Sequence, residues 1–322
     1  MKAIVCNNFG PIKDIQYKDV EDPKIEDNSV IIDVKSIGVN FPDGLLVQGK
    51  YQLKPETPFT PGMEVAGQVI EIGSKVSKFK IGDRVVGQSQ LGGYAEKALV
   101  KESSVFNIPE KMSFDDSCAL LCAYGTSHYA LKQRGNLKKG ELLVVLGASG
   151  STGIAAIQIG KIMGAKVIGV ASTEEKQKIA KESGADITLG YDNLKEELKA
   201  MSDGKGVDVI FDPVGGDIFD TVARTMARYG RLLVIGFASG TIPKLAVNLA
   251  LVKEFSVVGV FWGAFSRSQP DDYAKNMIEL FEWHQKGLVK PLIEEHFNLS
   301  EAATVLEKIL SRGAKGKVIL NP

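Results

Sequence analysis

A glycine-rich turn between two apolar segments is the part of this sequence whose residue types and spacing point most directly to chemistry. The apolar run 142–146 stops at Gly147, and the fingerprint Ala148-Ser-Gly150-Ser-Thr-Gly153 leads into a segment with helical spacing. A strand that ends in such a turn and opens a helix gathers free backbone N–H groups and the positive end of the helix dipole, which favour a phosphate. The turn therefore predicts a dinucleotide site, in which Gly150 lets the backbone approach the pyrophosphate and Gly153 lets the helix pack on the strand.

Two other interpretations of this turn are weaker. It could be a plain tight turn in a buried sheet, or a nucleophile elbow of the form G-x-S-x-G. The stretch Gly147-Ala-Ser149-Gly-Ser151 lacks the last glycine of that elbow, and the three histidines follow no order known for a catalytic triad.

The residues after the next apolar run indicate which dinucleotide is preferred. Proteins that prefer NAD usually carry Asp or Glu about 20 residues beyond the glycines, where the carboxylate binds the ribose 2′-hydroxyl. Here the run ends at Ala171, and Ser172, Thr173 and then Lys176 follow. Lys176 could be a solvated helix lysine. The two hydroxyls and the lysine ammonium, with no acidic residue directly after the run, nevertheless suit a 2′-phosphate. The sequence therefore favours NADP(H).

The elements that must position these residues follow two different patterns. Up to about residue 123 the chain consists of short β-branched segments bounded by Gly, Pro and Asp, which predict a largely antiparallel, barrel-like domain. After that point six apolar strands alternate with helical segments, which predicts an α/β fold with a doubly wound parallel sheet. One of the expected helices spans residues 217–230. A long helix over 271–287 and a strand over 316–322 follow.

Composition excludes several classes of function. The 322 residues include 39 basic and 39 acidic side chains, and without a basic stripe neither nucleic acid nor an anionic membrane is an expected partner. The longest apolar runs are too short to span a bilayer, and the first residues resemble a strand rather than a targeting signal. Three cysteines form no disulfide framework, which fits a reducing compartment, so a cytoplasmic protein is expected.

Seven motifs together resemble the zinc-free quinone oxidoreductases of the medium-chain dehydrogenase/reductase superfamily, with most similarity to the branch of quinone oxidoreductase-like protein 2. They are GVNFPDGLLVQGKYQ, PFTPGMEVAGQVIEIG, FKIGDRVVG, YGTSHYAL, GASGSTGIAAIQIGKIMGA, FDPVGG and the terminal GKVIL. The resemblance implies a GroES-like β-barrel catalytic domain over 1–123, completed by 265–322, and a Rossmann NADP(H)-binding domain over 124–264. It also implies a homodimer joined through the last Rossmann strand, SVVGVF.

Departures from the metal-using relatives imply a mechanism without zinc. Those relatives carry Cys and then Gly-His-Glu as ligand positions, where this chain has Asn40 and Gly62-Met63-Glu64. Cys118 and Cys122 lie one helical turn apart among apolar residues, which is typical of a buried structural pair. Glu64 is expected to be a packed, hydrogen-bonded carboxylate, and no metal ligand is predicted.

Without zinc, polarising an alcohol or aldehyde oxygen is difficult, whereas quinones and α,β-unsaturated carbonyls spread the charge that hydride delivery creates. By resemblance the catalytic candidates are Asn40, Asp43 and Tyr51. Where several quinone reductases have a tyrosine shortly after the asparagine, this chain has Leu45, so Tyr51 or solvent must supply the proton. Asn40 and Asp43 could instead simply cap a turn.

The resemblance also implies further cofactor contacts, transferred position by position. Beside Gly147, Gly150, Gly153, Ser172 and Lys176 they are Asn40, Thr126, Ser151, Thr152, Tyr191, Phe237, Phe261 and Lys317. The expected function is an NADPH-dependent reductase of quinones or activated enones. An enoyl-thioester reductase and, in another class, a non-catalytic NADPH-binding structural or regulatory protein stay as alternatives.

Overall fold

The computed structural model describes all 322 residues, and the chain divides into two compact units. Unit 1 contains residues Met1–Cys122, Gln269–Gln285 and Lys290–Pro322, and unit 2 contains Ala123–Ser268 and Lys286–Val289. The predicted limits of the two domains stay a prediction, because contacts within a chain do not test whether each part folds independently. No helix is both long and apolar enough to cross a membrane.

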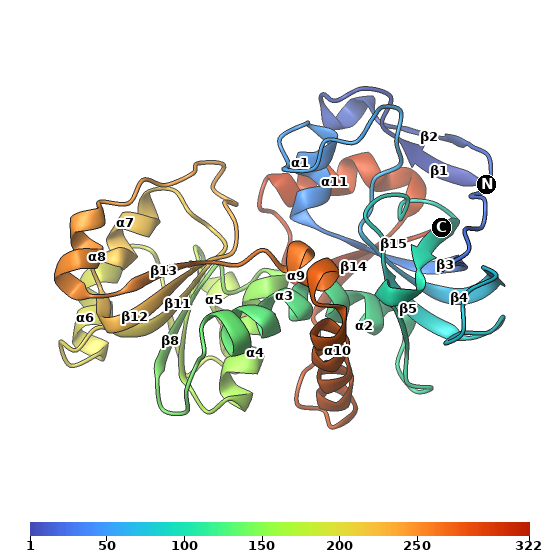
Figure 1. The fold of residues 1–322 in the computed structure, drawn as a ribbon. Coiled ribbons are helices and arrows are strands. Elements are labelled where there is room, and N and C mark those ends of the chain that lie inside the picture. Colours follow the sequence, from blue (N-terminus) through green and yellow to red (C-terminus); the bar gives the residue numbers. More distant parts are fainter. The chain divides into compact units, whose positions relative to one another are not determined.

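Unit 1 is built on a seven-stranded sheet with the order β14-β15-β3-β4-β5-β7, in which β6 also pairs with β3 (Figure 1). The strands are β3 (Ser29–Val39), β4 (Glu64–Ile72), β5 (Arg84–Gln88), β6 (Lys97–Lys101), β7 (Val105–Asn107), β14 (Ile293–Asn298) and β15 (Lys317–Asn321). All pairs are antiparallel except β14 with β15. A separate hairpin joins β1 (Lys2–Val5) and β2 (Gln16–Asp19).

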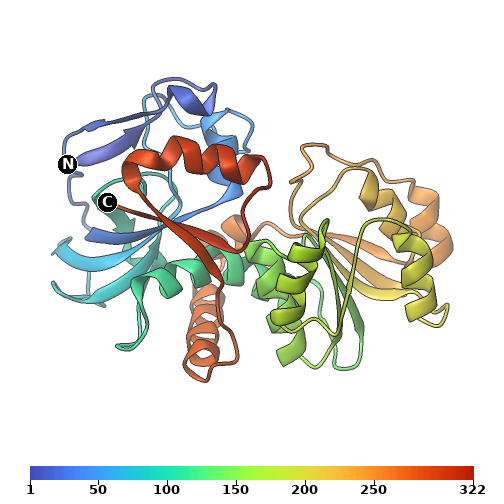
Figure 2. The same ribbon diagram turned by 180° about the vertical axis from the view of Figure 1, so that it is seen from behind.

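The helices of unit 1 are α1 (Phe41–Val47), α2 (Phe114–Ala119), α10 (Pro270–Gln285) and α11 (Ala302–Leu310). Gly44 of α1 lies so close to Leu310 of α11 that an added Cβ would come within 2.9 Å of that side chain. Figure 2 shows α11, in red, beside the blue N-terminal segments. The last 30 residues therefore complete the fold of the first 120.

Unit 2 contains a six-stranded parallel sheet with the order β10-β9-β8-β11-β12-β13 and helices on both of its faces (Figure 1). The strands are β8 (Leu142–Leu146), β9 (Lys166–Val170), β10 (Ile187–Leu189), β11 (Val207–Asp212), β12 (Met226–Val234) and β13 (Ser256–Gly259). The helices are α3 (Gly125–His128), α4 (Ser151–Ile162), α5 (Glu174–Glu182), α6 (Leu194–Met201), α7 (Asp217–Ala223), α8 (Val247–Lys253) and α9 (Trp262–Ser268). The strand order reverses beside β8, which is the doubly wound order that binds dinucleotides at its switch point.

The helix expected over residues 217–230 is shorter than predicted. α7 ends at Ala223, and β12 already begins at Met226. The backbone of this stretch lies against the turn at Gly206, where φ is +89° and an added Cβ would meet the nitrogen of Ala227 at 2.6 Å. The amide of Val207 donates to the carbonyl of residue 225. The pairing of β12 with β11 therefore outweighs the helical spacing of the sequence.

Candidate functional site

The predicted dinucleotide turn has the backbone geometry that its sequence suggests. β8 ends at Leu146, Gly147 adopts a φ of +60°, and Gly150 is the N-cap of the twelve-residue helix α4. A Cβ at Gly153 would lie 2.3 Å from the carbonyl oxygen of Gly147, so only glycine permits this approach of helix and turn. A Cβ at Gly150 would have its nearest neighbour, the carbonyl oxygen of Gly147, at 3.5 Å, so Gly150 is not required for internal packing.

Tyr191, which the sequence analysis assigned to the cofactor, lies beside this turn. The amide of Gly147 donates a hydrogen bond of 3.1 Å to the hydroxyl of Tyr191, which follows β10. The side chain of Tyr191 is half-buried and packs against the hydrophobic core of unit 2. The contact joins the carboxyl end of β8 to the loop after β10.

The residues predicted to select the dinucleotide follow β9. Thr173 is the N-cap of α5, and its hydroxyl accepts a hydrogen bond of 3.2 Å from the amide of Lys176. The side chain of Ser172 is exposed and that of Lys176 is half-buried. The acidic residues Glu174 and Glu175 occupy the first turn of α5, where their negative charges interact favourably with the positive end of the helix dipole. No acid stands at the end of β9 itself.

The other predicted cofactor residues of unit 2 lie at the starts of helices or just beyond strands. The hydroxyl of Ser127 donates to the carbonyl of Thr152 at 2.8 Å, which brings α3, with Thr126, to the first turn of α4, with Ser151. Phe237 follows β12 and lies so close to Gly215 that an added Cβ would meet its ring at 2.9 Å. Phe261 follows β13 and is 50% exposed.

In unit 1 three strands bring the predicted catalytic segment to a buried ion pair. β15 pairs with β3 so that Val318 is opposite Val39, and β4 pairs with β3 so that Val65 is opposite Ile37. The residues next to these pairs are Asn40, Glu64 and Lys317, and the register places them together although 253 positions separate the last two.

The Lys317 ammonium forms a salt bridge with Glu64 and donates a hydrogen bond of 2.8 Å to Oδ1 of Asn40. Lys317 is 2% exposed and Glu64 is fully buried. Burial opposes the ammonium form, but the attraction of Glu64 outweighs it and keeps the pKa of Lys317 above its usual range. Nδ2 of Asn40 donates to Glu64 at 2.9 Å and to the carbonyl of Gly38 at 3.2 Å, so the side chain of Asn40 is held on both sides.

A π-helical segment supplies a third partner of Glu64, in addition to Lys317 and Asn40. The chain forms π turns over Leu120–Tyr124 directly after α2, and the amide of Cys122 donates to Oε2 of Glu64 at 2.8 Å. A backbone amide that binds a carboxylate in mid-helix is the kind of irregularity that π segments permit. Burial raises the pKa of the Cys118 and Cys122 thiols well above the usual value, so both are neutral thiols.

Asp43 lies next to this cluster and is fully buried. Its Oδ2 accepts hydrogen bonds from the amide of Asn40 at 2.8 Å and from the hydroxyl of Tyr94 at 3.0 Å. Burial raises the pKa of Asp43 to about 7. The capping arrangement that the sequence left open for Asn40 and Asp43 is therefore present at the start of α1. Tyr51 is half-buried and packs against the core of unit 1.

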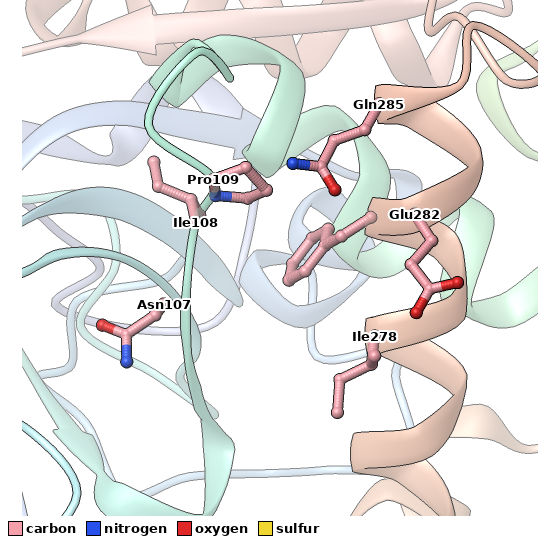
Figure 3. A pocket seen from close by; sticks show the side chains of 7 residues that line it. Asn107, Ile108, Pro109, Ile278, Glu282 and Gln285 are labelled. Atoms are coloured by element: carbon pink, nitrogen blue, oxygen red, sulfur yellow. The ribbon is translucent and has the colours of Figure 1, made fainter.

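A pocket of about 300 Å³ lies elsewhere in unit 1 (Figure 3). Its lining residues are Asn107, Ile108, Pro109, Ile278, Phe281, Glu282 and Gln285. None of the predicted site residues contributes to it.

Comparison with known proteins agrees with this geometry. Residues 26–110 match the alcohol dehydrogenase GroES-like domain, and residues 151–283 match the family described as zinc-binding dehydrogenase. The chain is 38% identical over 325 residues to the quinone oxidoreductase-like protein 2 homolog of Nematostella vectensis, covering 99% of this chain and 88% of that protein. This chain belongs to the quinone oxidoreductase family of the medium-chain dehydrogenase/reductase superfamily.

Solved quinone oxidoreductases have the same fold. The enzyme of Pseudomonas syringae superposes with a TM-score of 0.94 at 30% identity, covering 100% of this chain and 99% of that one. The Escherichia coli quinone oxidoreductase, solved in complex with NADPH, gives 0.93 at 28% identity with both chains fully covered. The predicted family and the predicted α/β fold, with a GroES-like domain and a Rossmann sheet, are confirmed, and the chain is a member of an oxidoreductase family.

The residues present at the metal positions of zinc-dependent members of the superfamily do not fit zinc. Asn40 and Met63 stand where Cys and His would supply ligands, and the Lys317 ammonium is already bound to Glu64. Because Lys317 and Glu64 are paired with each other, this position offers no set of ligands to a metal.

Two features of this quinone oxidoreductase site were missed by sequence reasoning. Tyr94 was not singled out, although its hydroxyl binds Asp43 and its ring lies against Gly62, where φ is +104° and a Cβ would come within 2.4 Å of the ring. The glycines on both sides of this contact, in PGME and GGYAE, were the available signal. The pairing of Lys317 with Glu64 was also missed, because Lys317 was assigned to the cofactor.

Proposed function

We propose that this chain binds NADPH in unit 2 and transfers its hydride to a quinone or another α,β-unsaturated carbonyl compound, without zinc. The observation that carries the proposal is the turn from Gly147 to Gly153, whose positive φ and tight helix contact match a pyrophosphate site at a helix N-terminus. The complex of the E. coli relative with NADPH supports the same coenzyme.

The residues of unit 2 divide the binding of NADPH between them. The backbone of Ser151 and Thr152 at the start of α4 offers N–H donors to the pyrophosphate. The N–H of Gly150 donates to the carbonyl of Gly147, so Gly150 contributes by letting the backbone approach the pyrophosphate. Ser172, Lys176 and Tyr191 form the pocket for the 2′-phosphate. Thr126, Phe237 and Phe261 are assigned to the nicotinamide side, and Lys317, the first residue of β15, is retained as a cofactor contact of the family pattern.

In unit 1, Asn40, Asp43 and Tyr51 are the residues proposed to orient the substrate carbonyl, and Asp43, which is fully buried, acts through Asn40. NADPH supplies the hydride, so the protein must position the acceptor and exclude competing reactions. A conjugated acceptor delocalises the charge that arrives with the hydride, which lowers the need for a Lewis acid. The Lys317–Glu64 pair, in place of metal ligands, supports such acceptors over alcohols.

Replacing Lys176 by alanine will weaken the binding of NADPH and leave the binding of NADH nearly unchanged, because only NADPH carries the 2′-phosphate. A lysine–phosphate contact is a charge-assisted hydrogen bond of roughly 1.5–3 kcal/mol, or about a ten- to hundredfold change in KM. Steady-state oxidation of both coenzymes by one quinone, with wild type and K176A, measures it. Lys178→Ala, on the exposed face of the same helix, is the matched control. Equal losses for both coenzymes would contradict the assignment.

We also propose that the protein is a cytoplasmic homodimer. β13 is the edge strand of the sheet, and the neighbouring helix α8 exposes three apolar residues strongly: Val247 at 74%, and Leu251 and Val252 at 78% each. An exposed apolar patch beside an open sheet edge favours association with a second copy. The three free cysteines support a reducing compartment. Sedimentation that finds only monomer at micromolar concentration would contradict the dimer.

A further inference from the structure

Unit 1 buries two carboxylates and only one ammonium in a single hydrogen-bonded cluster. Asp43 and Glu64 are fully buried and Lys317 is 2% exposed. Asn40 connects them, since its amide N–H binds Asp43 while its side chain binds Glu64 and Lys317. If both carboxylates were ionised, the cluster would hold a net negative charge out of contact with water, which is strongly unfavourable.

The hydrogen bonds show where a proton would relieve this charge. The ammonium of Lys317 binds Glu64 and Asn40, so Glu64 is the carboxylate that is neutralised by pairing. Asp43 receives both of its donors on Oδ2, whereas no donor of the protein reaches Oδ1, which is buried. A buried oxygen without any hydrogen-bond partner is far more costly on a charged carboxylate than as the O–H of a neutral carboxylic acid, so the unpartnered Oδ1 favours the acid.

We propose that Asp43 is a neutral carboxylic acid with its proton on Oδ1, and that in this form it is a positioning residue for Asn40. Its Oδ2 then holds the amide of Asn40 without adding a second negative charge. The groups that face Asp43 agree with this state. Burial raises the pKa of Tyr94 and of the Cys118 and Cys122 thiols, so that all three stay uncharged, and Glu64 and Lys317 cancel each other.

Loss of this proton at higher pH changes what holds Asn40. Burial raises the pKa of Asp43 to about 7, against about 3.9 in an unfolded chain. Once Asp43 is ionised, two buried carboxylates compete for the one ammonium of Lys317, which also holds Oδ1 of Asn40. The position of Asn40 is therefore pH-dependent, and turnover falls as pH rises through about 7, a consequence that rests on the proposed function.

The sign of the effect on stability follows from the same difference in pKa. Between pH about 4 and about 7 the folded protein holds a proton on Asp43 that the unfolded chain has released, so wild type loses stability as pH rises through this window. Asp43→Asn is a neutral isostere of the acid and lacks this loss. We expect the Tm of D43N relative to wild type to rise by about 5–10 °C between pH 4.5 and pH 8.

The test compares wild type, D43N and the control Asp271→Asn, which removes an exposed carboxylate from the first turn of α10. Thermal unfolding from pH 4.5 to 9 is combined with infrared difference spectra, in which wild type at pH 5.5 shows the C=O stretch of a protonated carboxyl that D43N lacks. D271N should show neither effect. A Tm difference for D43N that stays constant or falls with pH, or the absence of that infrared band, would overturn the proposal.

Glu64→Gln supplies a second, independent arm. It removes the competing carboxylate and leaves Lys317 to neutralise Asp43, so the infrared band should disappear at a lower pH than in wild type. An unchanged titration would show that the charge balance of the cluster does not set the protonation of Asp43. These arms need no turnover. If they succeed while no acceptor is reduced, only the proposed function fails; if turnover occurs without the infrared band, only this inference fails.

Discussion

Replacing Gly153 by valine will abolish NADPH binding and strongly destabilise unit 2. The first side-chain atom would lie 2.3 Å from the carbonyl oxygen of Gly147 and 2.9 Å from Cα of Ala148, and neither backbone atom can move without separating α4 from β8. Overpacking against backbone costs at least about 3 kcal/mol. Isothermal titration with NADPH and thermal unfolding of the purified variant measure both effects.

Gly150→Ala separates coenzyme binding from folding at the same turn. Its φ of −78° suits alanine, and the new Cβ would be 3.5 Å from Gly147, an ordinary contact. The variant should keep the wild-type Tm but bind NADPH at least about tenfold more weakly, because the methyl group stands where the pyrophosphate approaches. Gly10→Ala, whose Cβ would lie 3.9 Å from its nearest neighbour, Oδ2 of Asp14, is the control. Unchanged affinity in G150A would place the pyrophosphate elsewhere.

Replacing Lys317 by methionine will destabilise unit 1 by about 3–5 kcal/mol, because Glu64 is left as a buried charge without its cation. The double variant Glu64→Gln with Lys317→Met removes both charges and should recover most of that loss. Denaturant unfolding of wild type, both single variants and the double variant gives the coupling free energy directly.

A control for this cycle is an exposed ion pair of the same unit. Lys75 and Asp27 lie on the surface, and their cycle should give less than about 1 kcal/mol. Additive losses for Lys317 and Glu64 would contradict the buried pair. The affinity of the folded double variant for NADPH then tests the cofactor role that family resemblance assigns to Lys317. Loss of NADPH affinity would support that role, and unchanged affinity would contradict it.

Features that depend on local sequence were predictable. Strand, glycine turn and helix succeed one another within about 20 residues at 141–162, so short-range periodicity and the φ requirement of Gly147 suffice to place the turn. The alternation of strands and helices predicted the doubly wound sheet for the same reason. The family followed from the order of several such motifs along almost the whole chain.

Features that depend on strand register were not predictable. Lys317 meets Glu64 only because β15 and β4 both pair with β3, and nothing in the residues around 317 specifies that pairing. Tyr94 reaches Asp43 through a close backbone contact at Gly62, which depends equally on tertiary structure. The error over residues 217–230 has the same origin, because the packing of Ala227 against Gly206 overrode a helical pattern.

NADPH oxidation by the chelator-treated protein tests whether hydride passes from NADPH to a conjugated acceptor without zinc. The acceptors are a quinone, a small enone, an enoyl thioester and a simple aldehyde, and the zinc content is determined on the same sample. We expect oxidation with the quinone or the enone at an unchanged rate in chelator, with little turnover of the aldehyde. Tight binding of NADPH without oxidation by any acceptor would contradict this reaction. So would activity that is lost when the chelator removes about one zinc ion per chain.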